Sequence, residues 1–134
     1  MYNYIFNMNE SERDNILSKF FSRSYSGGIR SFSNVDVDTV KKLFELNFID
    51  PNESQNSSPT TKEIFDFMVD WPECTVHGYA VSKDRRDYRV SFEGIECDDP
   101  ELLSDADFMR DFTNLFRNAD SFDLTKTRAY CWFD

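Results

Sequence analysis

The chain of 134 residues has little of the chemistry on which most enzymes depend. It contains one histidine, His77, so a histidine general base could only be this residue. The glycines at residues 27–28 are not followed by the Lys-Ser or Lys-Thr pair of a phosphate-binding loop. No pair of carboxylates stands in the apolar setting that an acid–base couple requires. We therefore expect a protein that is not an enzyme and needs no cofactor.

Cysteines are few, and long apolar runs are absent. Cys74, Cys97 and Cys131 are an odd number at wide spacings, which predicts free, buried thiols. Cys74 and His77 have the spacing of zinc ligands, but residues three apart in a strand point to opposite faces, so we expect no metal site. The N-terminal residues lack the pattern of a signal peptide, and no run approaches the roughly 18 apolar residues of a membrane span. These absences predict a cytoplasmic protein without membrane contact.

Aromatic residues are abundant, with fourteen Phe, six Tyr and two Trp. A chain of this length fits one domain with one core, so we expect residues 1–134 to form a single domain with an aromatic core. The alternative for some of the rings is a role as anchors for a partner, because Tyr and Trp contribute large contact areas at interfaces.

Hydrophobic periodicity predicts three helices in the first half of the chain. They span residues 11–23, residues 36–47 and a segment that starts at Ser58 and Pro59. A polar connection, residues 50–61, precedes the third helix. The spacing in the third helix places four side chains inward: Ile64, Phe65, Met68 and Val69.

The second half of the chain alternates strands with a helix. Residues 75–82 and 87–96 have the period of a half-buried β-hairpin. Ser104 and Asp107 then have capping-box spacing at the start of a helix. Its apolar stripe comprises Ala106, Phe108, Met109, Phe112, Leu115, Phe116 and Ala119. A β-rich run at the C-terminus adds a strand. The sequence therefore predicts an α+β fold, with three N-terminal helices, a β-hairpin, a further amphipathic helix and a C-terminal strand that completes a small antiparallel sheet.

Four of the fifteen basic side chains lie together at the tip of the expected hairpin: Lys83, Arg85, Arg86 and Arg89. In its order of three helices and a hairpin, the chain resembles winged-helix DNA-binding domains, which implies a regulator that contacts nucleic acid through this tip. The helix that would enter the DNA groove has Lys62 against three acidic residues, however, and phosphate contacts supply most non-specific affinity. Direct nucleic-acid binding is therefore disfavoured. The alternative is a charged turn in which Asp84 and Asp87 pair with the arginines.

Negative charge is concentrated in residues 98–123, which hold eight acidic and two basic side chains in a chain of net charge −10. The densest part comprises Asp98, Asp99, Glu101, Asp105, Asp107 and Asp111. One explanation is structural, because anions are favourable at a helix N-terminus. The other is a surface that binds a basic partner. Asp107 and Asp111 favour the second, since like charges four residues apart destabilise a helix.

The chain is similar in size and charge to small acidic inhibitors of restriction or CRISPR nucleases and to immunity proteins that neutralise nuclease toxins. This resemblance implies an interaction module that binds the basic surface of a partner, such as the nucleic-acid-binding groove of a nuclease, through the six acidic residues. The alternative is the winged-helix-like regulator, which would use the four basic residues at the hairpin tip.

Overall fold

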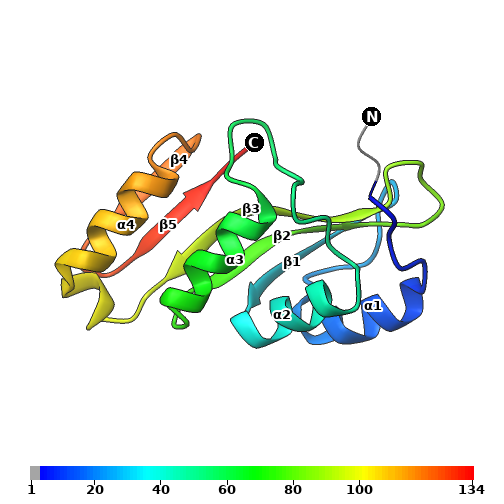
Figure 1. Cartoon of the computed structure of the whole chain (residues 1–134), viewed down its shortest axis with the longest axis horizontal. Helices are drawn as coiled ribbons and strands as arrows, with labels where there is room; N and C mark the ends of the chain where they lie inside the picture. The colour runs from blue at the N-terminus through cyan, green and yellow to red at the C-terminus, as the bar shows by residue number, and fades with distance from the viewer. Residues whose placement is uncertain (1–3) are drawn as a thin grey trace.

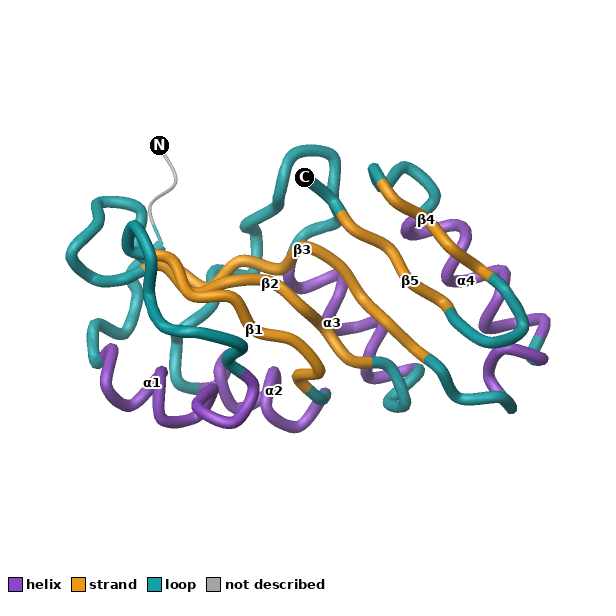
Figure 2. Tube along the Cα trace, turned by 180° about the vertical axis from the view of Figure 1, so that it is seen from behind, coloured by secondary structure: helices purple, strands orange, loops and turns teal. Residues whose placement is uncertain are grey.

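Helices cover one face of a five-stranded antiparallel sheet in the computed structural model, which describes residues 4–134 (Figure 1). The opposite face of the sheet carries no helix from the described residues (Figure 2). The helices are α1 Glu10–Leu17, α2 Val37–Glu45, α3 Thr61–Asp70 and α4 Ala106–Phe116, with short 3₁₀ helices at Ser18–Phe20 and Leu102–Ser104. The strands are β1 Ile29–Val35, β2 Thr75–Val81, β3 Arg89–Cys97, β4 Ser121–Leu124 and β5 Ala129–Trp132. The predicted α+β class is confirmed.

The sheet is built from two hairpins and one added strand, in the order β1-β2-β3-β5-β4. The β2–β3 hairpin is the one that the sequence predicts. Two features of the sheet were not predicted. Residues 29–35, expected to interrupt two helices, form an edge strand along β2, and the C-terminal run pairs as a second hairpin instead of one strand.

Each of the three longer helices is preceded by a residue whose side chain accepts a hydrogen bond from a backbone N–H group of the first turn. Asp36 caps α2, Thr60 forms a reciprocal capping box with Glu63 at α3, and Asp105 caps α4. The predicted start of α3 at Ser58 and the predicted cap of α4 at Ser104 are therefore wrong by two positions and one position, because several residues before each helix have side chains able to cap.

The core is aromatic, as the composition predicts. Phe108, Phe112 and Phe116 on α4 are completely buried and contact Phe67 of α3, with ring centroids 5.1–6.2 Å apart. Two details of the expected helix faces are wrong. Val69 is 55% exposed while Phe67 is buried, and Ala106 is exposed because it lies at the start of α4. Within residues 4–134, no helix is long and apolar enough to cross a membrane.

Candidate functional site

The acidic run occupies the segment between β3 and α4 and the first turns of α4, at one end of the molecule (Figure 1). Two of its members stabilise local structure. Asp99 Oδ1 accepts hydrogen bonds from the backbone N–H groups of Glu101 and Leu102, at 2.9 and 3.3 Å. Asp105 Oδ1 does the same for Asp107 and Phe108, at 2.8 and 3.1 Å. The structural explanation therefore accounts for Asp99 and Asp105 as caps.

Asp107 and Asp111 lie on the solvent side of α4 with Arg110 between them. The guanidinium of Arg110 is 3.2 Å from a carboxylate oxygen of each. The repulsion expected between two like charges is thus offset by a shared cation, and their spacing no longer indicates a cost to the helix. The Asp107 side chain is 70% exposed and the Asp111 side chain 38% exposed, so both remain accessible to a partner.

Asp98 and Glu101 complete the run without a structural role. Both are exposed, and neither side chain forms an ion pair or hydrogen bond within residues 4–134. Their charges are therefore available to a partner without the loss of an ion pair or hydrogen bond among residues 4–134.

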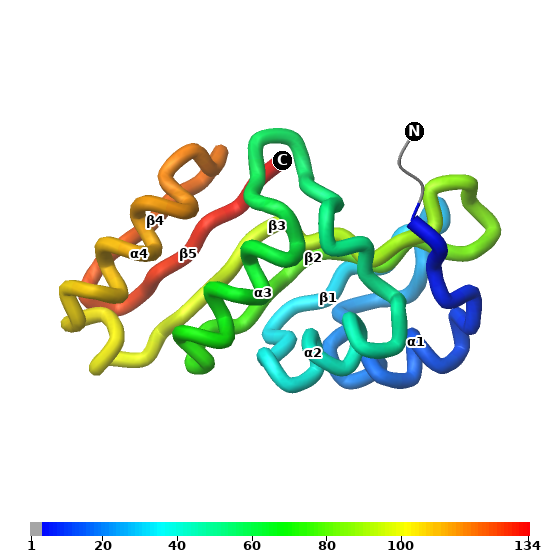
Figure 3. Tube along the Cα trace, viewed as in Figure 1, coloured from blue at the N-terminus to red at the C-terminus, as the bar shows by residue number. Residues whose placement is uncertain are grey.

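Helix α3 extends the acidic surface beyond the predicted residues. Phe67 of α3 contacts the phenylalanines of α4, which sets the two helices side by side on the sheet (Figure 3). A shallow groove of about 390 Å³ lies between them, with Asp70 and Asp111 among its lining residues. Asp70 lies in the last turn of α3, where a negative charge opposes the helix dipole. That position, unhelpful to the helix itself, is the sequence signal that could have identified Asp70.

Charges on these two segments are strongly unbalanced. Helix α3 and residues 98–111 together carry nine carboxylates and two basic side chains. Both basic side chains, Lys62 and Arg110, form ion pairs with acidic neighbours in their own helices. The surface formed by the two segments therefore has a strongly negative net charge, without an unpaired cation among its described residues.

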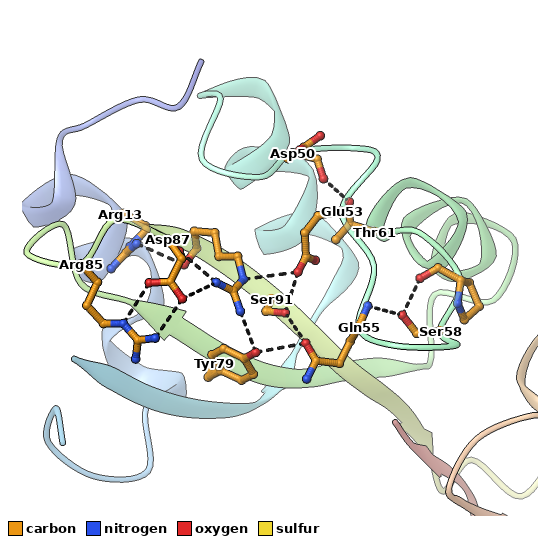
Figure 4. A network of polar contacts seen from close by, with 12 residues as sticks. Arg13, Asp50, Glu53, Gln55, Ser58, Thr61, Tyr79, Arg85, Asp87 and Ser91 are labelled. Carbon is orange, nitrogen blue, oxygen red and sulfur yellow. Dashed lines mark hydrogen bonds and ion pairs between the residues drawn. The ribbon is translucent and has the colours of Figure 1, made fainter. Parts of the chain in front are cut away.

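The basic cluster at the hairpin tip is largely neutralised within the fold (Figure 4). Arg85 binds both carboxylate oxygens of Asp87 at 2.9 Å and donates to the Gly27 carbonyl at 3.1 Å. Arg89 also donates to Asp87, at 2.9 Å. These two arginines hold the turn through Asp87, as the alternative interpretation of the cluster expects. The expected pairing of Asp84 with an arginine is wrong, because its carboxylate accepts a hydrogen bond from the Ser82 hydroxyl instead. Lys83 and Arg86 are exposed, and their side chains form no ion pair within residues 4–134.

A partly buried polar cluster, which the sequence did not predict, attaches the connection between α2 and α3 to the sheet (Figure 4). Ser91 donates to Glu53 at 2.9 Å, Arg89 pairs with Glu53 at 3.4 Å, and Tyr79 donates to Gln55 at 3.0 Å. Burial raises the pKa of the Glu53 carboxyl, against smaller opposing effects of Ser91 and Arg89. Glu53 Oε2 is buried without a hydrogen-bond partner. The cluster fixes this long loop to the sheet.

Arg13 is a second buried polar residue that the sequence did not indicate. It is completely buried on α1, donates to the Val81 carbonyl at 2.9 Å and lies over the Tyr88 ring at 4.7 Å. Asp14 pairs with it at 3.0 Å. Arg13 therefore links α1 to the β2–β3 hairpin, and its role is structural.

The three cysteines are free and buried. A hydrogen bond from the Cys74 thiol lowers the pKa of Cys97, while burial raises the pKa of Cys131 to about 12. His77 stacks on Tyr130 with ring centroids 5.3 Å apart, its Nε2 lies 3.1 Å from the Cys131 carbonyl oxygen, and burial lowers its pKa. Among residues 4–134 no group of three or more His, Cys, Asp or Glu side chains is placed to hold a metal ion.

Comparison with models of protein families, with curated proteins and with solved structures finds no match to this chain.

Proposed function

We propose that the protein is a non-enzymatic interaction module that binds a basic surface of another protein. The contact surface is the acidic face, defined here as the exposed carboxylates Asp70, Asp98, Glu101, Asp107 and Asp111. The observation that carries the proposal is the charge imbalance of this face, which two packed helices and the adjoining segment form together. Opposite charge across an interface accelerates association and suppresses wrong partners.

The partner's chemistry follows from the sign and density of this charge. A protein surface rich in Lys and Arg is typical of nucleic-acid binding, because phosphate contacts provide most of that affinity. The acidic face would occupy such a groove in place of DNA or RNA, as an inhibitor of a nuclease or of another nucleic-acid-binding protein does. On this proposal DNA or RNA competes with the module for the partner.

The experiment starts from the partner captured by the wild-type protein from its own cells, identified by mass spectrometry and purified. Its association rate is then measured at several salt concentrations against Asp98→Lys/Glu101→Lys. We expect slower association, because the variant loses long-range attraction to a basic partner. The salt dependence should also weaken, because less attraction remains for salt to screen over its length of about 8–10 Å at physiological ionic strength. Double-stranded DNA added to the partner should displace the wild-type module.

The matched control is Glu12→Lys/Glu45→Lys, which makes the same change in net charge on exposed residues of α1 and α2. A second control, Lys83→Glu/Arg86→Glu, tests the hairpin tip without disturbing Asp87. Both controls should associate more nearly like the wild type. Equal loss in all three variants, or a loss confined to the tip variant, would contradict the acidic-face proposal.

A further inference from the structure

The groove between α3 and α4 combines an apolar floor with acidic rims. Phe67 and Leu115 form the apolar part, and Asp70 and Asp111 stand beside it with Asn114. Trp71 contacts Phe108 at the start of α4, whereas Phe67 contacts Phe116 at its end, so the helices run antiparallel along the groove. This arrangement is continuous with the acidic face and gives it an apolar centre.

The rim carboxylates retain capacity for a partner. Both hydrogen bonds from Arg110 to Asp111 end on Oδ1, so Oδ2 of that carboxylate has no hydrogen-bond partner within residues 4–134. Asp70 is exposed, and its side chain likewise makes no ion pair or hydrogen bond in the described part of the chain. A cation that reaches the groove therefore meets carboxylate oxygens from both helices.

A partner that matches both features must present apolar side chains flanked by Lys or Arg. An amphipathic helix does so, because residues at i, i+3, i+4 and i+7 share one face and the flanking positions project to either side of it. The groove is shallow and open, unlike the concave pockets that bury most of a small ligand.

We infer that this groove binds a basic amphipathic helix of the partner, with its apolar face on Phe67 and Leu115 and its basic residues beside Asp70 and Asp111. The inference rests on the proposed function and specifies how the acidic face recognises its target. Recognition then has two components, a charge component that salt screens and an apolar component that salt does not screen.

Two synthetic peptides of identical composition test this inference. One places Leu on a single helical face with Lys and Arg elsewhere, and the other has the same residues in scrambled order. Binding to the full chain is measured by fluorescence anisotropy at low and at physiological salt. We expect the amphipathic peptide to bind on the order of tenfold more tightly than the scrambled peptide, with the ratio preserved at the higher salt.

Two variants locate the binding site. Leu115→Ala should weaken the amphipathic peptide several-fold and leave the scrambled peptide unchanged. Asn114→Arg places a basic side chain over the groove at an exposed position, so it should weaken the amphipathic peptide even if Leu115→Ala perturbs packing. The surface control is Glu45→Arg on α2.

The outcomes separate this inference from the proposed function. Equal binding of both peptides, or binding that neither groove variant changes, would overturn the groove while leaving the acidic face intact. Absence of binding by either peptide at low salt would also overturn the groove. The acidic face is tested separately, by the association rates of the charge-reversal variant and its controls with the purified partner.

Discussion

Phe112→Ala is the sharpest test of the packing that creates the acidic face. Phe112 is completely buried and contacts rings from three elements. Its centroid lies 6.2 Å from that of Phe67 on α3, 5.1 Å from Phe116 on α4 itself and 5.4 Å from Phe122 on β4. It therefore joins both helices of the groove to the last hairpin of the sheet.

The expected cost follows from burial and from the cavity left behind. Truncation of a buried Phe to Ala typically costs about 3–5 kcal/mol, and the cost rises when neighbours cannot move into the space. Phe67 and Phe122 belong to other elements that the sheet holds in place, so we expect the upper half of that range. Since domains are stable by roughly 5–15 kcal/mol, the variant should lose about a quarter or more of the free energy of unfolding.

Urea unfolding followed by circular dichroism measures this loss. The urea concentration at the midpoint of unfolding should fall. The m value, which is the slope of the unfolding free energy against urea concentration, should change little, because the variant exposes nearly the same surface on unfolding. Asn114→Ala, an exposed position on the same helix, should change stability by no more than about 0.5 kcal/mol. A double-mutant cycle with Phe122→Ala should show a coupling of about 0.5–1.5 kcal/mol. A loss below about 1 kcal/mol for Phe112→Ala would refute the packing described here.

Three other predictions concern buried polar groups and thiols. Arg13→Ala should lower the free energy of unfolding in urea by about 3–5 kcal/mol, because it leaves the Val81 carbonyl and Asp14 without the partner they have in the fold. Arg23→Ala, at an exposed position, should lower it little. Burial raises the pKa of the Glu53 carboxyl, so the folded protein binds the proton of this group more tightly than the unfolded chain does. The contribution of Glu53 to stability is therefore greatest below its unfolded pKa and is lost as pH rises through its folded pKa. Glu53→Gln should therefore gain stability relative to wild type from about pH 4 to pH 7, and a difference independent of pH would contradict the burial argument. A bulky disulfide reagent should label no thiol of the native protein quickly, because all three are buried. Cys97, whose pKa is lowered, should react before Cys74 and Cys131, whose pKa values are raised, because thiolate formation controls the reaction; rapid labelling of native Cys131 would show that it is not buried.

Local sequence patterns were sufficient to predict the helices and strands that have strong hydrophobic periodicity. The spacing of Phe108, Phe112 and Phe116 predicts the buried face of α4, and the alternation around Tyr88 and Phe92 predicts the β2–β3 hairpin. These patterns are informative because each element has one apolar face, and that face must be buried wherever the element lies. The same reasoning predicted an aromatic core and an α+β fold.

Strand β1 shows where local pattern fails. Its sequence, IRSFSNV, follows two glycines and buries only Phe32 and Val35. An edge strand of this kind has little apolar alternation, and its existence depends on hydrogen bonds to β2, whose residues are about fifty positions away. The burial of Arg13 could not be predicted from local pattern for a similar reason. The carbonyl oxygen that accepts its hydrogen bond, and so makes its burial tolerable, belongs to Val81, which is distant in sequence.

The concentration of negative charge after β3 can be read from the sequence, because it follows from the order of Asp and Glu along the chain. Which of these carboxylates are available to a partner depends on the tertiary structure. Asp99 and Asp105 became caps through backbone groups of their own turns, whereas Asp70 joined Asp111 only because Phe67 packs against α4. The physical reason is that a charge acts on its surroundings over distances set by the folded chain, and these are unrelated to its position along the sequence.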